Sequence, residues 1–478
     1  MTTTLILLPL AAALVVWLLP LPGRAAGALA LLVALAEVVL FALAVWGFDF
    51  DRGLQLQDRQ SWFSDLGVSY HVGFFGFSLW LAGLTIVVCA AAIGYALRAG
   101  GDRGRAYFGL LLFLTGAIVG VFAAQDLLLF YVFFEAMLIP LYVLIGVWGG
   151  PRRLRATALF VIYTMAGSLL MLAAIVVFGL SQGTFSLVDS GTSANEWVFL
   201  GFLAAFAVKA PLFPFHGWLV DAYRESPPEV AAILSGVVSK AAVYGLLRIA
   251  IDKFPEPVQQ YQTLILSLAA IGLVYGSLLA FRAPDMRAVV AYSSMGQMGL
   301  IVLGLFSLSE LGVTGAIVHS VAHGLVSACL FLLAGMLEAR TGTSAFDRIR
   351  GMARGRPALA TMLMATGVIA LAVPGSVVFA GEFLILAGAY VQGWGWAAVG
   401  VGAIVLAAMY MLRLISAVLH TPPAGGGAEA GPDLRWSDLS VVVPLLAALL
   451  VLSAWPAAIS ERSFVELESE PGTELLSR

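Results

Sequence analysis

The chain has 478 residues, of which 61% are hydrophobic and only 11% are charged, and its net charge is -3. A soluble globule of this size would need far more polar surface, so the composition excludes a soluble enzyme and predicts a protein that crosses a membrane many times. The small net charge and the lack of a basic stripe also exclude nucleic acid as an expected partner.

Apolar runs long enough to cross a bilayer recur along the whole chain. About fourteen are present, near residues 4–22, 26–48, 73–97, 106–123, 124–147, 158–180, 197–220, 229–250, 261–281, 288–307, 313–337, 358–390, 397–420 and 439–459. They are too long for barrel strands and do not alternate strictly, so helices must satisfy the backbone inside the lipid. The predicted fold class is therefore an all-α integral membrane protein.

Arginine and lysine gather in every second loop. One set of loops contains Arg24, Arg98, Arg103, Arg105, Arg152, Arg153, Arg155, Arg224, Arg282, Arg287, Arg340, Arg348, Arg350, Arg354, Arg356 and Arg435. The opposite loops and the tails contain only Arg52, Arg59, Lys253, Arg462 and Arg478. The positive-inside rule then predicts that the first set is cytoplasmic and that both termini are on the outer side, which requires an even number of spans.

The fifth span has a glutamate near its centre. Glu135 lies in the stretch FYVFFEAMLIPLY, within an apolar run from about 124 to 147. A charge at the middle of a bilayer costs roughly 2.5 to 3.5 kcal/mol even on the lenient insertion scale. We therefore expect Glu135 to have a functional role.

The seventh and twelfth spans are interrupted by proline. AVKAPLFPFHGWL contains Pro211 and Pro214, and LAVPGSVVFAGEFLIL contains Pro374 and Gly375. Each break removes backbone hydrogen bonds that only buried polar groups or water can replace. Broken helices five spans apart indicate an inverted-repeat transporter with its site near mid-membrane, although two ordinary kinks are an alternative.

Further ionisable residues lie inside the apolar spans. They are Lys209 next to the first break, Lys240, His319, His323, and Glu382 just after the second break. Glu135 and Lys209 are the natural first pair, because a lysine facing a carboxylate can act as a protonation switch. His319 and His323 are four residues apart and share a helix face, which suits them to relay protons between Lys240 and Glu382. Charges that only hold helices together are the alternative.

Other kinds of chemistry leave no pattern in the sequence. There is no metal-ligand cluster, phosphate-binding loop, dinucleotide fingerprint or nucleophile triad, and Cys89 and Cys329 stand alone in apolar spans. We expect no cofactor and no metal in this chain, and we expect it to move a small ion rather than to transform a substrate.

Five motifs give the sequence a resemblance to a known family, the antiporter-like membrane subunits of respiratory complex I, and most closely to the M or chain 4 type. They are FYVFFEAMLIPLYVLIGVWGG, AFAVKAPLFPFHGWLVDA, DMRAVVAYSSMGQMGL, AHGLVSACLFLLAGMLEARTGT and PGSVVFAGEFLILAGAY, in order over roughly residues 70 to 420. The resemblance implies fourteen transmembrane helices with two inverted five-helix repeats and discontinuous helices 7 and 12. It divides the chain into 1–105 (helices 1–3), 106–250 (first repeat), 251–420 (second repeat) and 421–478 (a loop, helix 14 and a short tail).

The resemblance also implies roles for individual residues. Glu135 resembles the helix 5 glutamate of the family, Lys209 its helix 7 lysine partner, and Lys240 the central lysine of helix 8. Glu382 resembles the helix 12 glutamate of M-type subunits, where the L and N types usually have lysine. The implied activity is proton translocation within NADH-quinone oxidoreductase in the bacterial plasma (inner) membrane, beside other membrane subunits of complex I, with quinone and NADH bound by other subunits.

Three positions depart from the family pattern. Gly73-Phe74-Phe75-Gly76 replaces GVDGIS and loses its acid, Tyr223 replaces the histidine of DAH, and Gln297 replaces the histidine of SSxSHMG. These changes put in question a cytoplasmic proton route that uses those side chains, while the central charges are intact.

Rival functions remain open at this point. The chain could be a subunit of an Mrp-type multisubunit sodium/proton antiporter or of a related membrane-bound redox complex. It could also be a structural scaffold whose buried charges only cement helices, or a stand-alone solute carrier.

Overall fold

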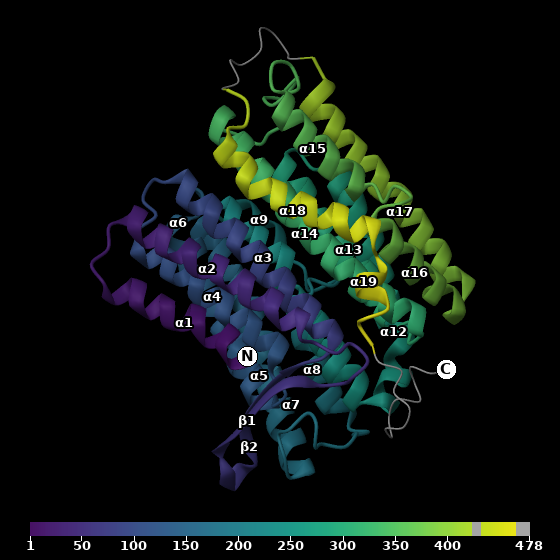
Figure 1. Cartoon of the computed structure of the whole chain (residues 1–478). Helices are drawn as coiled ribbons and strands as arrows, with labels where there is room; N and C mark the ends of the chain where they lie inside the picture. The colour runs from purple at the N-terminus through teal and green to yellow at the C-terminus, as the bar shows by residue number, and fades with distance from the viewer. Residues whose placement is uncertain (423–431, 465–478) are drawn as a thin grey trace.

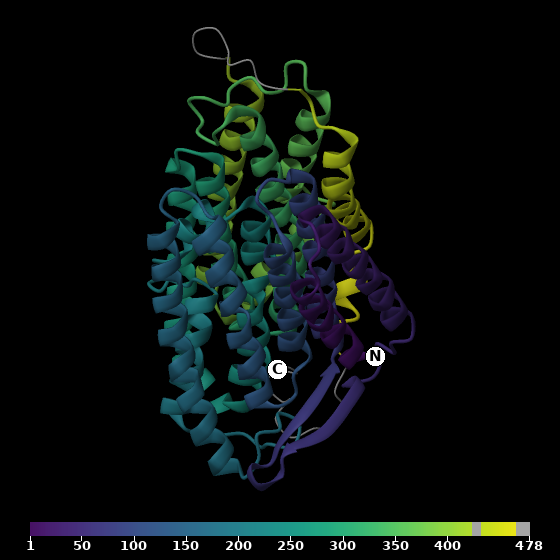
Figure 2. The same ribbon diagram turned by 90° about the vertical axis from the view of Figure 1, so that its left-hand side faces the viewer.

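The computed structural model describes residues 1–422 and 432–464 as a bundle of helices that run along one long axis (Figures 1 and 2). Eleven helices of the described residues are long and apolar enough to cross a membrane. Three shorter apolar helices, α1, α15 and α16, add to them. The all-α membrane fold is confirmed, while the count of fourteen spans, the inverted repeats and the four-part division of the chain stay predictions.

The helices follow the predicted runs closely. Their bounds are α1 Thr2–Leu18, α2 Gly23–Trp46, α3 Gly76–Ala99, α4 Arg105–Ala123, α5 Leu127–Ala136, α6 Leu138–Trp148, α7 Arg153–Gln182, α8 Glu196–Lys209, α9 Leu219–Glu225, α10 Pro228–Ile233, α11 Lys240–Gly245, α12 Pro255–Arg282, α13 Met286–Leu305, α14 Glu310–Thr341, α15 Pro357–Ala370, α16 Val377–Gln392, α17 Trp394–Ile415, α18 Trp436–Ala454 and α19 Ala457–Ser460. Three π-helical segments, η2 Leu234–Val238, η3 Leu246–Ile251 and η4 Ser416–His420, continue α10, α11 and α17. The predicted C-terminal tail lies largely outside the described residues.

Within the described residues, one β-hairpin interrupts the all-helical pattern, and the hydropathy of the sequence did not reveal it. Strands β1 Gln55–Phe63 and β2 Val68–Phe74 pair antiparallel, and a short 3₁₀ turn, η1 Ser64–Leu66, joins them. The Thr3 hydroxyl donates to Asp58 over 2.8 Å, and the Phe77 amide donates to the Ser463 carbonyl over 3.0 Å. The beginning of the chain and the last described residues therefore meet at the hairpin end of the bundle (Figure 2).

Both predicted helix breaks are present. Helix α8 ends at Lys209 and α9 begins ten residues later at Leu219, while α15 ends at Ala370 and α16 begins at Val377. The Trp218 indole donates to the Val208 carbonyl over 3.0 Å at the first break. Buried polar groups thus satisfy the backbone that the break exposes, as the hydrocarbon environment requires.

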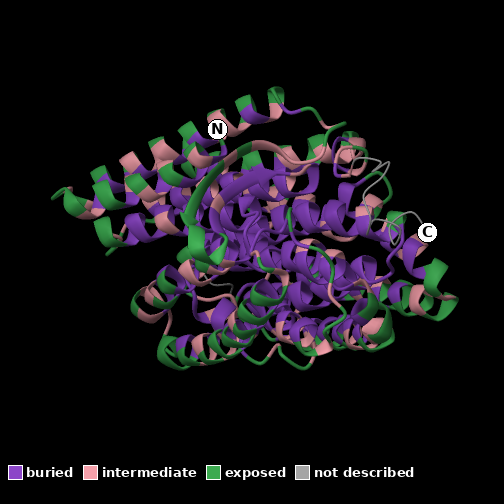
Figure 3. Ribbon diagram, turned by 90° about the horizontal axis from the view of Figure 1, so that it is seen from below, coloured by how far each residue is buried: buried purple, intermediate pink, exposed green. Residues whose placement is uncertain are grey.

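Burial separates the helices into an inner and an outer set (Figure 3). The most apolar stretches of α14 and of the continuous segment Pro228–Ile251 are entirely buried, whereas only 22% of that of α2 is buried. Outer helices can leave apolar side chains facing lipid, but polar groups at mid-depth must be enclosed. Lys240, His319 and His323 all belong to the enclosed set.

Candidate functional site

Lys240 lies at the centre of the bundle, where the π-helical segment η2 passes into α11. In η2 the backbone hydrogen bond of Ser239 reaches back five residues to Leu234. Such π segments are rare and are frequent at functional sites. The Lys240 ammonium donates to the Ser235 carbonyl over 2.7 Å and to the Ser239 hydroxyl over 3.3 Å.

The third contact of Lys240 connects two inner helices. Its Nζ lies 2.8 Å from Nδ1 of His323 on α14. A methyl group at Gly236 would lie 3.0 Å from the Gly324 carbonyl oxygen, so glycine at these positions lets the two helices approach closely. An ammonium donates and a ring nitrogen accepts, so the pair is arranged for direct proton exchange between Lys240 and His323.

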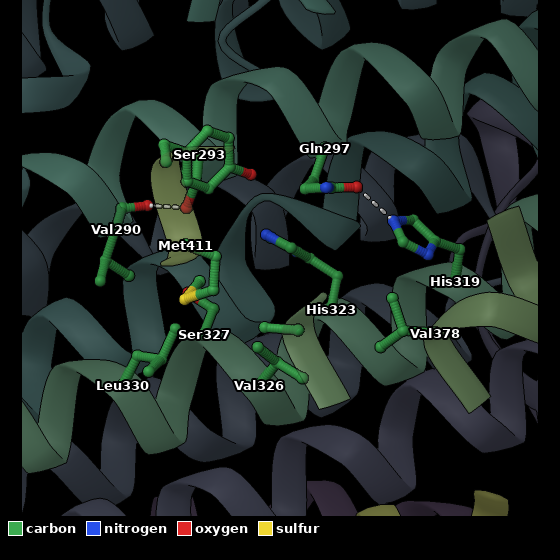
Figure 4. A pocket seen from close by; sticks show the side chains of 12 residues that line it. Val290, Ser293, Gln297, His319, His323, Val326, Ser327, Leu330, Val378 and Met411 are labelled. Carbon is green, nitrogen blue, oxygen red and sulfur yellow. Dashed lines mark hydrogen bonds between the residues drawn. The ribbon is translucent and has the colours of Figure 1, made fainter. Parts of the chain in front are cut away.

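The two histidines share one face of α14, as their spacing predicted. Their ring centroids are 6.3 Å apart, and both side chains are buried. Nε2 of His319 lies 2.6 Å from Oε1 of Gln297 on α13 (Figure 4). Because an amide oxygen only accepts, this bond places a proton on Nε2 of His319.

Gln297 also connects His319 to the second broken helix. Its side chain interacts with the carboxyl group of Glu382 on α16 and with the hydroxyl group of Tyr410 on α17. A methyl group at Gly381 would lie 2.8 Å from Cβ of His319, which shows how closely α16 approaches α14 here. Glu382, only 3% exposed, is thus enclosed beside Gln297.

A small cavity lies beside these residues (Figure 4). Its volume is about 30 Å³, and its polar lining comes from Ser293, Gln297, His319, His323, Ser327 and Tyr410. A cavity of this size has room for one or two water molecules, which need two or more polar partners. The lining provides them, so water can join groups that do not touch directly.

Glu135 and Lys209 have a different environment. Lys209 is 2% exposed, and its Nζ lies 4.7 Å from the centroid of the Phe134 ring, a cation–π distance. The two charges interact electrostatically, but no ion pair within 4.0 Å joins Glu135 and Lys209 in the described part of the chain. Phe130, Phe134 and Phe206 pack around this region.

The predicted site residues thus form two groups. The first group is Lys240, His323, His319 and Glu382, in which Gln297 bridges the last two. The second group is Glu135 and Lys209, which lie together behind aromatic side chains. The sequence reading missed the bridging position of Gln297 and the presence of Tyr410. Both are polar side chains inside apolar spans, and this feature of the sequence could have identified them.

A second omission is Glu37 of α2. Its side chain is 1% exposed, and neither of its carboxyl oxygens has a hydrogen-bond partner among the described residues. Two charges nearer the helix ends are satisfied locally: Asp126 caps α5 by accepting from Leu128 over 2.9 Å, and Arg248 pairs with Asp252 at 2.5 Å.

A known transmembrane family, described as "NADH:quinone oxidoreductase/Mrp antiporter, TM", matches residues 124–407. The chain belongs to this family. It is 36% identical to NADH-quinone oxidoreductase subunit M of Mycobacterium tuberculosis, over 95% of its own length and 90% of that relative's. It is 34% identical to NAD(P)H-quinone oxidoreductase chain 4 1 of Picosynechococcus sp., with 95% and 88% covered.

Solved structures agree with this membership. A chain of "Respiratory complex I from Thermus thermophilus with bound NADH" has a TM-score of 0.89 and 33% identity, with 97% of each chain covered. A chain of the Mrp complex from Dietzia sp. DQ12-45-1b has a TM-score of 0.87 at 22% identity, with 97% and 96% covered, which shows a shared fold. The segment that matches the NADH:quinone oxidoreductase/Mrp antiporter family contains Glu135, Lys209, Lys240, Glu382 and both histidines.

Proposed function

We propose that this chain is a proton-translocating membrane subunit of a respiratory NADH:quinone oxidoreductase, of the M or chain 4 type. Relatives at 34–36% identity carry the names of such subunits, and a chain of respiratory complex I has the same fold. The redox reaction takes place in other subunits that bind NADH and quinone. This chain contributes the proton pathway and contacts neighbouring membrane subunits of the complex.

The line of contacts from Lys240 to Glu382 carries this proposal. Lys240 exchanges a proton with His323 at 2.8 Å, and His319 is joined through Gln297 to Glu382. Gln297 does not ionise, so the proton passes it through water in the adjoining cavity. If these buried charges only held helices together, they would need to form ion pairs. Among the described residues, none of these side chains forms one.

The electrostatic pair of Glu135 and Lys209 supplies the coupling in this proposal. Quinone reduction elsewhere in the complex changes the interaction of Glu135 with Lys209, and the displaced charge releases the proton held at Lys240. The proton then leaves through Glu382 on the far side of the second helix break. The proposal includes the orientation that the positive-inside rule predicts, with the arginine-rich loops in the cytoplasm and both termini on the outer side.

A Lys240→Ala variant tests the proposal in membrane vesicles that oxidise NADH. We expect NADH-driven proton translocation to fall by on the order of tenfold or more, the scale on which a positioned acid–base group acts. Ser320→Ala is the matched control, since Ser320 is equally buried and, among the described residues, its hydroxyl bonds only the Ala316 carbonyl of its own helix. Wild-type translocation per NADH in Lys240→Ala would refute the proposal.

The Mrp-type antiporter is the rival with the same fold. It would assemble without redox subunits and would exchange sodium for protons in cells that lack complex I. Mass spectrometry of the native assembly separates the two, because only the respiratory complex contains flavin and iron–sulfur subunits alongside this chain.

A further inference from the structure

A group of buried hydroxyls lies between Lys240 and the end of the bundle with the arginine-rich loops. The Ser235 hydroxyl donates to the Ser294 hydroxyl over 2.9 Å and forms a short hydrogen bond with the Ser327 hydroxyl. These three serines come from η2, α13 and α14, and each is at most 2% exposed. Burying a hydroxyl among apolar helices costs free energy unless it forms a hydrogen bond. Here the three hydroxyls, from three elements, hydrogen-bond to one another.

Tyr223 extends this group toward the arginine-rich end of the bundle. Its side chain is fully buried, and its ring packs edge-on against Phe331 with centroids 5.6 Å apart. Its hydroxyl makes no hydrogen bond within the described residues, although it lies near enough to Ser235 and Ser294 to interact with them. A buried hydroxyl with an unused donor thus lies beside the serine cluster.

Both ends of the group meet groups that can exchange protons. Two residues before Tyr223, Asp221 is partly exposed and lies 3.6 Å from Arg155 in the first turn of α7, next to an arginine-rich loop. At the inner end, Ser327 lies one helical turn from His323, and both line the cavity of about 30 Å³. The Ser235 carbonyl oxygen also accepts a hydrogen bond from the Lys240 side chain over 2.7 Å.

We infer that Tyr223, Ser294, Ser235 and Ser327 form the proton uptake route from the cytoplasmic face to Lys240 and His323. The inference rests on the function proposed above and adds the relay residues of its input side. Each hydroxyl oxygen accepts a proton from one neighbour and releases its own proton to the next, so no bond between heavy atoms changes. One proton enters near Asp221, and one reaches the Lys240 amine or His323 through water in the cavity.

This route accounts for one departure from the family pattern. Tyr223 stands where the family motif has a histidine. A hydroxyl both donates and accepts without ionising. A chain of hydroxyls can therefore conduct a proton where the titratable side chain is absent.

The test compares four variants of the assembled complex in NADH-oxidising vesicles: Ser235→Ala, Tyr223→Phe, Lys240→Ala and the control Ser320→Ala. Ser235→Ala removes the central hydroxyl, and Tyr223→Phe removes a single oxygen atom. We expect each to lower the rate of proton translocation about fivefold or more at equal amounts of assembled complex. Ser235→Thr keeps the hydroxyl and should restore translocation, a rescue that a purely structural role of Ser235 would not require.

The outcomes separate the inference from the proposed function. Loss in Lys240→Ala with wild-type rates in Ser235→Ala and Tyr223→Phe would overturn the hydroxyl route and leave the function standing. An equal loss in Ser320→Ala would show that any buried serine matters for packing, which also overturns the route. Wild-type translocation in Lys240→Ala would remove the proposed function and the route together.

Discussion

The two broken helices place a buried charge on opposite sides of their breaks. Lys209 is the last residue of α8, before the first break, whereas Glu382 lies in the second turn of α16, after the second break. Lys209 faces the ring of Phe134 at 4.7 Å and has no ion-pair contact with Glu135 in the described chain. Glu382 instead adjoins the Gln297 amide, which holds His319 at 2.6 Å.

This difference separates two tasks that the sequence pattern makes look alike. A cation over an aromatic ring is stabilised without a proton acceptor, so its charge can respond to a distant carboxylate. A carboxyl group beside an amide, a histidine and a water-sized cavity is placed to take and release protons. The first break therefore suits electrostatic control, and the second suits proton transfer.

Glu382→Gln, at the second break, should have the largest effect on proton translocation. The amide has the size of the carboxyl group and can still contact Gln297, but it cannot take up a proton. We expect NADH-driven proton translocation to fall by on the order of tenfold or more, with partial recovery in Glu382→Asp. Translocation assays in vesicles with equal amounts of assembled complex provide the measurement, and full activity of Glu382→Gln would remove this residue from the pathway.

Phe134→Leu should have a smaller effect, at the first break. A desolvated cation–π contact contributes about 2 kcal/mol, so the charged form of Lys209 loses that support. We expect a several-fold loss of translocation with little change in the amount of complex. Phe130→Leu is the control, because it removes a neighbouring ring that packs at a tilt against Phe134, with centroids 5.6 Å apart, but does not lie under the ammonium. Equal losses in both variants would attribute the effect to packing.

The N-terminal caps of the two broken helices should give the smallest effects. Asn195 directly precedes α8 and caps it by accepting a hydrogen bond from the Val198 amide over 3.2 Å. Asp433 caps α15 from a segment distant in the sequence and accepts from the amides of Ala358 and Leu359 over 2.9 Å. Replacing either cap by alanine should cost about 1 kcal/mol of stability. Amide hydrogen exchange at the first turn of each helix measures the loss.

Only the second cap should depend on pH. Partial burial acts to raise the pKa of Asp433, but the backbone N–H groups of Leu359 and Ala358 prevail and lower it below its usual value. A carboxyl group with a depressed pKa stabilises the fold above its unfolded pKa, and this contribution is lost as the pH falls through the folded pKa. Exchange at Ala358 and Leu359 should therefore accelerate below about pH 4, whereas exchange at Val198 should show no such step beyond the intrinsic pH dependence of exchange. A matching step at Val198 would contradict this assignment.

The sequence by itself determined the class of fold, the positions of the helices and the buried charges, because lipid leaves no alternative for long apolar runs and makes every ionisable residue within them costly. Proline marked both breaks, because it removes backbone hydrogen bonds within a helix. The hairpin at residues 55–74, the bridging place of Gln297 and the serine cluster at Ser235 were decided by tertiary structure. Their contacts join residues far apart in the chain, at distances set by close approach of helices at glycines such as Gly236 and Gly381. Hydrophobic periodicity records which residues are buried, but not which of them meet.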